Sequence, residues 1–156
     1  MYQRGNHQIS VVNIGGAGDA TNQLNWPYGI ELDKITNTLY IADYSNHRIV
    51  AYPKNETNGT VVFGGQGAGI NMTQLCAPVG IYLDYITNSL LIANHGAHNV
   101  LRWIRMKDRW TLMAGDINGV ANSTSTTLRA VTDMILDPMG NMYVADRNNH
   151  RIQLFM

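Results

Sequence analysis

The chain has 156 residues, of which 45% are hydrophobic and 14% charged, enough for one domain with a sizeable core. Eleven Lys and Arg residues balance eleven Asp and Glu residues, so the net charge gives no electrostatic reason to expect a polyanionic partner. No run of about 18 apolar residues is present to span a bilayer. The start, MYQRGNHQIS, lacks the apolar core of a secretory signal, and one cysteine, Cys76, permits no internal disulfide and no multi-cysteine metal site.

The predicted elements are short strands. Residues 1–23 contain one strand, ISVVNI, followed by a connection. Units of four strands then follow at 24–65 and 75–115, and a third unit at 128–156 lacks its fourth strand. The apolar runs are rich in strand formers and bounded by turn residues, and no segment has the three-to-four-residue apolar spacing of a helix.

These units are copies of one another. The stretch LYIADYSNHRIVAY at 39–52 recurs as LLIANHGAHNVLRW at 90–103 and as MYVADRNNHRIQLF at 142–155. Four-stranded sheets repeated about every 50 residues describe the blades of a β-propeller. The predicted fold is therefore all-β, a propeller segment of about three four-stranded blades.

Two of the copied segments also resemble a known family. YIADYSNHRI and YVADRNNHRI are similar to the signature of NHL repeats, in which Ala-Asp and a short turn precede Asn-His-Arg-Ile. NHL propellers generally have six blades, so the resemblance implies that this chain is half of a six-bladed ring. The Tyr-Trp-Thr-Asp propeller repeats of lipoprotein receptors are the second choice, because Tyr-Ile-Ala-Asp occupies their motif slot. Kelch repeats share the approximate period and a double glycine, but no Tyr and Trp follow Gly64-Gly65 at kelch-like spacing. WD repeats are excluded because their Trp-Asp and Gly-His pairs are missing.

The turn after the second strand concentrates polar residues that resemble a small catalytic site. Asp43 and Arg48 recur in the third unit, whereas the middle unit has Asn94 and Asn99 in their places. Loss of acid and base together is expected of an ion pair, because either partner alone would leave a desolvated charge. A histidine persists in every copy. We therefore predict a structural brace between the second and third strands, formed by Asp43, His47, Arg48, His98, Asp146, His150 and Arg151.

The ends of the chain lie at the same phase of the repeat. Tyr52, Trp103 and Phe155 share one slot at the end of the third strand, and Tyr2 occupies that slot before the first unit. Two arrangements follow from this phase. The chain is a fragment of a larger propeller, or two copies assemble head to tail, each lending its first strand to the other's last blade. Left alone, such an array exposes apolar blade faces and an unpaired edge.

Few residues outside the brace suggest a ligand. His95 and His98 form a His-x-x-His motif, but no third metal ligand is identifiable nearby, so we predict neither a metal nor a cofactor. The recurring aspartates at the ends of the first strands are expected to cap turns rather than bind metal; they are Asp33, Asp84 and Asp137.

The segment RWIRMKDRW mixes basic and aromatic residues. A surface of Arg102, Arg105, Lys107, Arg109 and Trp110 has the composition of a single-stranded RNA site. The alternative is a hairpin of the two outer strands that turns at 107–108, with Trp103 in the aromatic slot of the repeat. The neutral chain favours the hairpin over a nucleic-acid partner.

Four Asn-x-Ser/Thr sequons fall in predicted loops, at Asn55, Asn58, Asn71 and Asn122. They favour an extracellular or lumenal setting, which agrees with the free cysteine and the missing signal only if an amino-terminal part is absent.

The predicted function is a non-catalytic scaffold that binds a protein partner through the long connections at 62–78 and 114–130. The alternatives are part of a metal-dependent propeller enzyme, lyase-like or lactonase-like and completed by missing blades, and single-stranded RNA binding.

Overall fold

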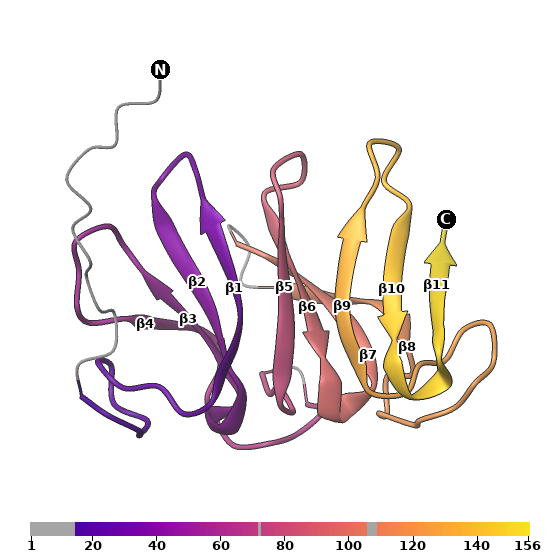
Figure 1. Ribbon diagram of the computed structural model, residues 1–156, viewed down its shortest axis with the longest axis horizontal. Helices are drawn as coiled ribbons and strands as arrows, with labels where there is room; N and C mark the ends of the chain where they lie inside the picture. The colour runs from indigo at the N-terminus through magenta and orange to yellow at the C-terminus, as the bar shows by residue number, and fades with distance from the viewer. Residues whose placement is uncertain (1–14, 72, 106–108) are drawn as a thin grey trace.

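The computed structural model describes residues 15–71, 73–105 and 109–156. These residues form three antiparallel sheets that stand side by side (Figure 1). The predicted strand ISVVNI and the predicted turn at 107–108 lie outside the described residues. Within the described ranges, no helix is long and apolar enough to cross a membrane.

Each sheet is a meander of consecutive strands. The first contains β1 (Pro27–Asp33), β2 (Thr38–Asp43), β3 (Arg48–Tyr52) and β4 (Thr60–Gly64). The second contains β5 (Pro78–Asp84), β6 (Ser89–Asn94), β7 (Asn99–Ile104) and β8 (Arg109–Gly115). The third contains β9 (Val131–Leu136), β10 (Met142–Asp146) and β11 (Arg151–Phe155). The predicted all-β fold of about three repeated sheets is confirmed.

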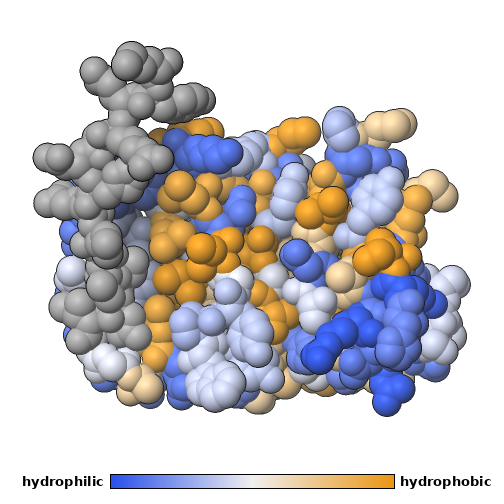
Figure 2. Space-filling view, in the orientation of Figure 1, coloured by the Kyte–Doolittle hydropathy of each residue, from blue (hydrophilic) through white to orange (hydrophobic). Residues whose placement is uncertain are grey.

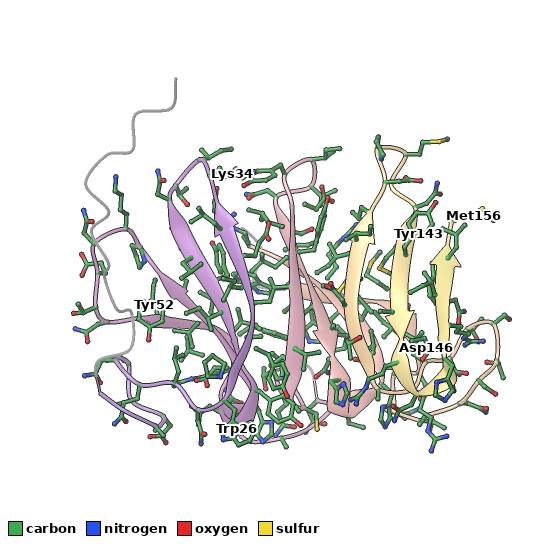
Figure 3. The ribbon with its side chains drawn as sticks, viewed as in Figure 1. Trp26, Lys34, Tyr52, Tyr143, Asp146 and Met156 are labelled. Carbon is green, nitrogen blue, oxygen red and sulfur yellow. The ribbon has the colours of Figure 1, made fainter. Side chains whose placement is uncertain are left out.

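A short 3-10 turn joins the second and third strands of every sheet. These turns are η1 (Tyr44–Asn46), η2 (His95–Ala97) and η3 (Arg147–Asn149). The first strand of each sheet begins at the same end as this turn, as the pairing of Pro27 with Asp43 shows for the first sheet. In the first two sheets the fourth strand ends there as well, and in the first sheet Gly64 pairs with Arg48. We call this the turn end of the blades. Trp26 and Asp146 lie toward this end in Figure 3, and Lys34 lies at the opposite end.

The first strands β1, β5 and β9 lie next to one another along the near face in Figure 1. Their close approach requires glycine at one position. A Cβ on Gly29 would lie 2.1 Å from the carbonyl oxygen of Val79, and a Cβ on Gly80 would lie 2.8 Å from that of Thr132. The third blade has Asp133 at the corresponding position.

Burial differs between the middle and outer sheets. One core cluster fills the space between the first and second sheets, and a second cluster fills the space between the second and third. Every residue of β6 is therefore buried, as expected for a strand covered on both faces. In β1, by contrast, Ile30 and Leu32 are 65% and 45% exposed. Figure 2 shows apolar side chains gathered in the middle of the near face, over β1 and β5.

Candidate functional site at the turn end of the blades

The three 3-10 turns share one backbone geometry. The histidine after each turn lies in the left-handed region, with φ of 53° at His47 and 55° at His98 and His150. Its amide donates back to the carbonyl of the first turn residue, at 3.1 to 3.3 Å. Because the geometry is the same in all three blades, differences among the side chains are not imposed by the turn itself.

In the first blade the predicted acid and base are in contact. Arg48 Nε donates to Asp43 Oδ2 at 2.7 Å, and Asp43 is fully buried. The amide of Asn25 donates to Asp43 Oδ1, and Asn46 Nδ2 donates to Oδ2, both at 2.7 Å. The Arg48 guanidinium also donates to three carbonyls of the segment before β1, those of Asp19, Ala20 and Gln23. The pair therefore fixes that segment as well as the turn.

The third blade repeats this arrangement with a more exposed base. Arg151 Nε donates to the buried Asp146 Oδ2 at 2.8 Å, and the Arg129 amide donates to Asp146 Oδ1 at 2.6 Å. The Arg151 guanidinium reaches three carbonyls of the preceding connection, those of Ser123, Thr124 and Thr127. The Arg151 side chain is 29% exposed, against 6% for Arg48.

The middle blade holds the same turn without charge. The Cys76 amide donates to Asn94 Oδ1 at 2.7 Å, and Asn94 Nδ2 donates to Asn99 Oδ1 at 3.2 Å. Asn99 Nδ2 reaches one carbonyl, that of Asp116. Two amides thus occupy the positions of the ion pair, and neither position is left with a buried unpaired charge.

The repeated histidines connect successive blades. His47 Nδ1 accepts the amide of Ala77 at 3.0 Å, and His98 Nδ1 accepts the amide of Ala130 at 3.0 Å. We call this contact the histidine clamp. An Nδ1 that accepts a hydrogen bond is unprotonated, so the ring proton of both residues is on Nε2. Burial lowers the pKa of His98, which favours this neutral form. These histidines were predicted to hold their own turns, and their contact with the next blade was not predicted.

The first residues of the three turns line one pocket. Tyr44, His95 and Arg147 occupy equivalent positions, and all three face a pocket of about 450 Å³ that also borders Gly80 and Asp133. Of these three residues, only His95 was predicted as a candidate ligand. A comparison of the copies shows that this position differs in every blade, but it does not show that the side chains meet.

His95 has the opposite tautomer to the clamp histidines. Its Nδ1 lies 3.0 Å from the carbonyl oxygen of Val131. A carbonyl only accepts, so Nδ1 carries the proton and the neutral ring keeps Nε2 as an acceptor. The predicted candidate metal ligands His95 and His98 therefore bond to adjacent backbone groups at the start of β9, the Val131 carbonyl and the Ala130 amide. Among residues 15–71, 73–105 and 109–156, no group of three metal-ligating side chains lies together.

The rest of the pocket is aromatic and charged. The rings of Tyr28 and Tyr44 are 5.1 Å apart and tilted by 43°. Arg147 and Asp133 are both exposed and border the same pocket, yet no ion pair joins them in the described part of the chain. The pocket thus combines a cation, a carboxylate, an imidazole acceptor and an aromatic pair.

The residues of the predicted basic and aromatic surface have different surroundings. Arg102 lies 3.6 Å from Asp84, and Arg105 donates to Asp33 at 3.0 Å with its guanidinium 5.4 Å from the Tyr40 ring centre. Trp110 packs against the first core cluster. Arg109 begins β8, and Lys107 lies outside the described residues. Two of the four basic residues are therefore engaged in ion pairs.

The aspartates at the end of β1 and β5 and directly after β9 accept backbone amides of the following turn. Asp33 Oδ1 accepts from Ile35, and Asp84 Oδ1 accepts from Ile86. Asp137 Oδ1 accepts from Met139. Burial alone would raise the pKa of Asp33, but hydrogen bonds from the side chain of Thr36, from two backbone amides and from Arg105 lower it overall. All three aspartates have local structural partners.

The four sequon asparagines are exposed in connections. Asn55 and Asn58 lie between β3 and β4, Asn71 lies between β4 and β5, and Asn122 lies between β8 and β9.

Comparison with known proteins identifies the repeat. The NHL repeat family matches residues 132–155. An auxiliary nutrient binding protein from Bacteroides thetaiotaomicron superposes with a TM-score of 0.67 at 18% identity, over 80% of this chain and 36% of its own. A virginiamycin B lyase from Staphylococcus aureus superposes at 0.59 and 15% identity, over 88% of this chain and 40% of its own.

A gluconolactonase from Xanthomonas campestris gives a TM-score of 0.58 at 16% identity, over 80% of this chain and 36% of its own. The chain thus corresponds to well under half the length of each of these proteins. The predicted resemblance is confirmed, because residues 132–155 match the NHL repeat family and the described chain has the fold of β-propeller blades.

Proposed function

We propose that this chain is part of a non-catalytic propeller scaffold that binds a protein partner at the turn end of its blades. The observation that carries the proposal is the pocket shared by Tyr44, His95 and Arg147. The three copies keep the histidine that ends the turn and vary the residue that faces this pocket. Variable side chains on a fixed frame are the usual arrangement of a binding surface.

The chemistry of the pocket suits an acidic segment of the partner. The Arg147 guanidinium is exposed and has no ion-pair partner among the described residues, so it is available to a carboxylate. Tyr28 and Tyr44 offer an aromatic pair beside it, and tyrosine and arginine are enriched at the residues that dominate protein interfaces. An acidic residue next to an apolar or aromatic one matches this arrangement.

The long connections support a partner larger than a small molecule. Residues 65–77 and 116–130 join successive blades and begin and end at the turn end. They therefore lie at the same end of the blades as the turn residues that line the pocket. Loops of this kind, held by a rigid sheet, commonly contribute to binding.

A metal-assisted propeller enzyme, lyase-like or lactonase-like, is the second candidate. The observation that favours it is the Nε2 acceptor of His95, which has no hydrogen-bond partner among the described residues. A backbone carbonyl at the other ring nitrogen is the usual partner of a metal-bound or basic histidine. Further side chains from other blades would have to complete such a site.

Selection of displayed random peptides on the full chain tests the first candidate. We expect enrichment of Asp and Glu, and about tenfold weaker binding of the selected peptides to the Arg147→Ala variant. Lys54→Ala is the matched control, because Lys54 is an exposed cation at the opposite end of the blade. Peptides that bind Arg147→Ala and Tyr44→Ala as tightly as the original chain would contradict the proposal.

A further inference from the structure

The hairpins that join the first and second strands of each blade project at the end opposite the 3-10 turns (Figure 1). Each of them has an apolar side chain at its tip. These residues are Ile35, Ile86 and Met139, which are 78%, 89% and 88% exposed. They hold equivalent positions, because each lies two residues after the aspartate that begins its turn. Figure 2 shows apolar side chains along the upper edge of the molecule, where these hairpins end. We call the three residues the apolar tips.

The exposure of the apolar tips is not caused by the limits of the array of blades. The middle blade is packed on both faces, and its tip residue Ile86 is the most exposed of the three. Ile35 is also exposed, although the next blade reaches its hairpin, where the Lys34 amide donates to Tyr85 Oη at 2.9 Å. Contacts between blades therefore leave the tips uncovered.

The turns themselves do not require an apolar residue at the tip. Each tip residue donates its backbone amide to the aspartate before it, at 2.9 to 3.0 Å, and any residue except proline can do so. The left-handed positions of the first two hairpins belong to Asn37 and Asn88 instead. Single exposed apolar residues are common on protein surfaces, but here the same exposed position is apolar in all three copies. This repetition points to a contact with something outside the blades.

A hydrogen-bond donor lies further into the blades than the tips. Ile86 and Met139 border a pocket of about 550 Å³ between the second and third blades, which Arg102 also lines. Arg102 belongs to β7, and its Nε is buried without a hydrogen-bond partner among the described residues. Tyr85, next to Ile86, is 45% exposed. From the tips inward, apolar side chains therefore come first, and an aromatic side chain and a donor follow. A lipid leaflet has the matching order, with acyl chains deepest and acceptor oxygens at the headgroups.

The charges at this end of the blades are balanced. The buried aspartates of the first two hairpins each have an arginine nearby, Arg105 at 3.0 Å and Arg102 at 3.6 Å. The remaining charged residues in the described connections at this end are two cations and two anions, namely Lys34, Lys54, Glu56 and Asp137. A surface without net charge gains little from anionic lipid, so a zwitterionic lipid surface is sufficient.

We propose that the apolar tips dock this end of the blades on a zwitterionic lipid surface. The tips enter the acyl region, Lys34 and Tyr85 lie at the level of the headgroups, and Arg102 Nε donates to a phosphate or ester oxygen. Separate protrusions suit a lipid surface, because lipid deforms around each of them, whereas a folded partner would need a matching cavity for each tip. The turn end, with the pocket that Arg147 lines, stays free for the proposed protein partner.

Cosedimentation of the full chain with phosphatidylcholine vesicles tests this proposal. We expect reversible binding, half-maximal at about 1 mM lipid. Ile86→Ser should weaken it about tenfold, and serine at all three tips should abolish it. Because the charges are balanced, raising the salt concentration from about 0.1 to 0.5 M should leave binding unchanged. The serine variants should unfold in urea like the original chain, since the replaced side chains are exposed.

Ile152→Ser is the matched control. Ile152 is 68% exposed, but it lies in β11 near the turn end, so its replacement should leave vesicle binding unchanged. Equal losses for Ile86→Ser and Ile152→Ser would overturn the proposal, because they would indicate adhesion through the blade faces.

Three other outcomes would overturn the proposal as well. They are the absence of vesicle binding at any accessible lipid concentration, binding that requires anionic lipid and is lost at high salt, and capture of a protein by the tips while vesicles stay unbound. None of them depends on peptide binding at Arg147, so failure here is separable from failure of the proposed function.

Discussion

The outer and middle blades hold the same turn by different chemistry. Asp43 and Arg48 form a buried ion pair in the first blade, whereas Asn94 and Asn99 make a single side-chain hydrogen bond in the middle blade. The turn itself is unchanged, since φ of the following histidine is 53° and 55°. The two pairs differ in the number of backbone carbonyls that they bind. The side chain of Arg48 donates to three carbonyls, whereas that of Asn99 donates to one. The comparison indicates that charge in this turn serves to anchor the chain that enters the blade.

The largest effect is expected from breaking the pair in the first blade. Asp43→Asn leaves the Arg48 guanidinium buried without its carboxylate. Removing one partner of a buried pair typically lowers the free energy of unfolding by about 3–5 kcal/mol. Urea unfolding of the full chain measures this loss. A loss below about 1 kcal/mol would mean that the backbone carbonyls alone satisfy Arg48.

Converting the first blade to the middle-blade pair should recover part of that loss. The double variant Asp43→Asn with Arg48→Asn has no buried charge, as in Asn94 and Asn99. We expect a double-mutant cycle to give a favourable coupling energy of at least about 1 kcal/mol between Asp43 and Arg48. Strictly additive losses would show that the two residues act independently.

The third blade should be less sensitive than the first. Asp146→Asn leaves the Arg151 guanidinium without its carboxylate, but the Arg151 side chain is 29% exposed and remains in contact with water. We expect a loss of about 1–2 kcal/mol in the free energy of unfolding, smaller than for Asp43→Asn. Equal losses in the two blades would contradict the role given to burial.

The smallest expected effect is a pH dependence that arises from the burial of His98. The pKa of His98 is lowered in the folded chain from the ordinary 6.5, so the unfolded chain binds the proton more readily. The stability contributed by neutral His98 is therefore complete above pH 6.5 and decreases as the pH falls toward the folded-state pKa. We expect His98→Ala to reduce the slope of unfolding free energy against pH in this acidic range. A slope that the substitution leaves unchanged would show that His98 does not contribute to the pH dependence of stability.

The comparison of blades also explains how far sequence reasoning reached. The joint loss of acid and base in the middle unit was sufficient to predict a local pair, because the two residues are close in the sequence and in the fold. The clamp was missed, since His47 finds its partner Ala77 in the next blade and backbone amides leave no sequence signal. Likewise, Arg105 is engaged by Asp33 through a contact between blades that no local pattern reveals.

The candidate pocket was only partly predictable for the same reason. His95 attracted attention because of its chemistry, but Tyr44 and Arg147 are ordinary surface residues in isolation. Their variation across the copies was visible in the sequence. That the three side chains border one pocket depends on how the blades are arranged around their first strands, and this arrangement follows from long-range packing.

The most direct test of the division between frame and binding surface compares two arginines of the third blade. Arg151 neutralises the buried Asp146, whereas Arg147, four residues earlier, faces the pocket. We expect Arg151→Met to lower the free energy of urea unfolding by about 2 kcal/mol, because Asp146 keeps a buried unpaired charge. Arg147→Met should change it by less than about 0.5 kcal/mol. Equal losses for both variants, or a larger loss for Arg147→Met, would contradict the assignment of Arg151 to the frame and Arg147 to the binding surface.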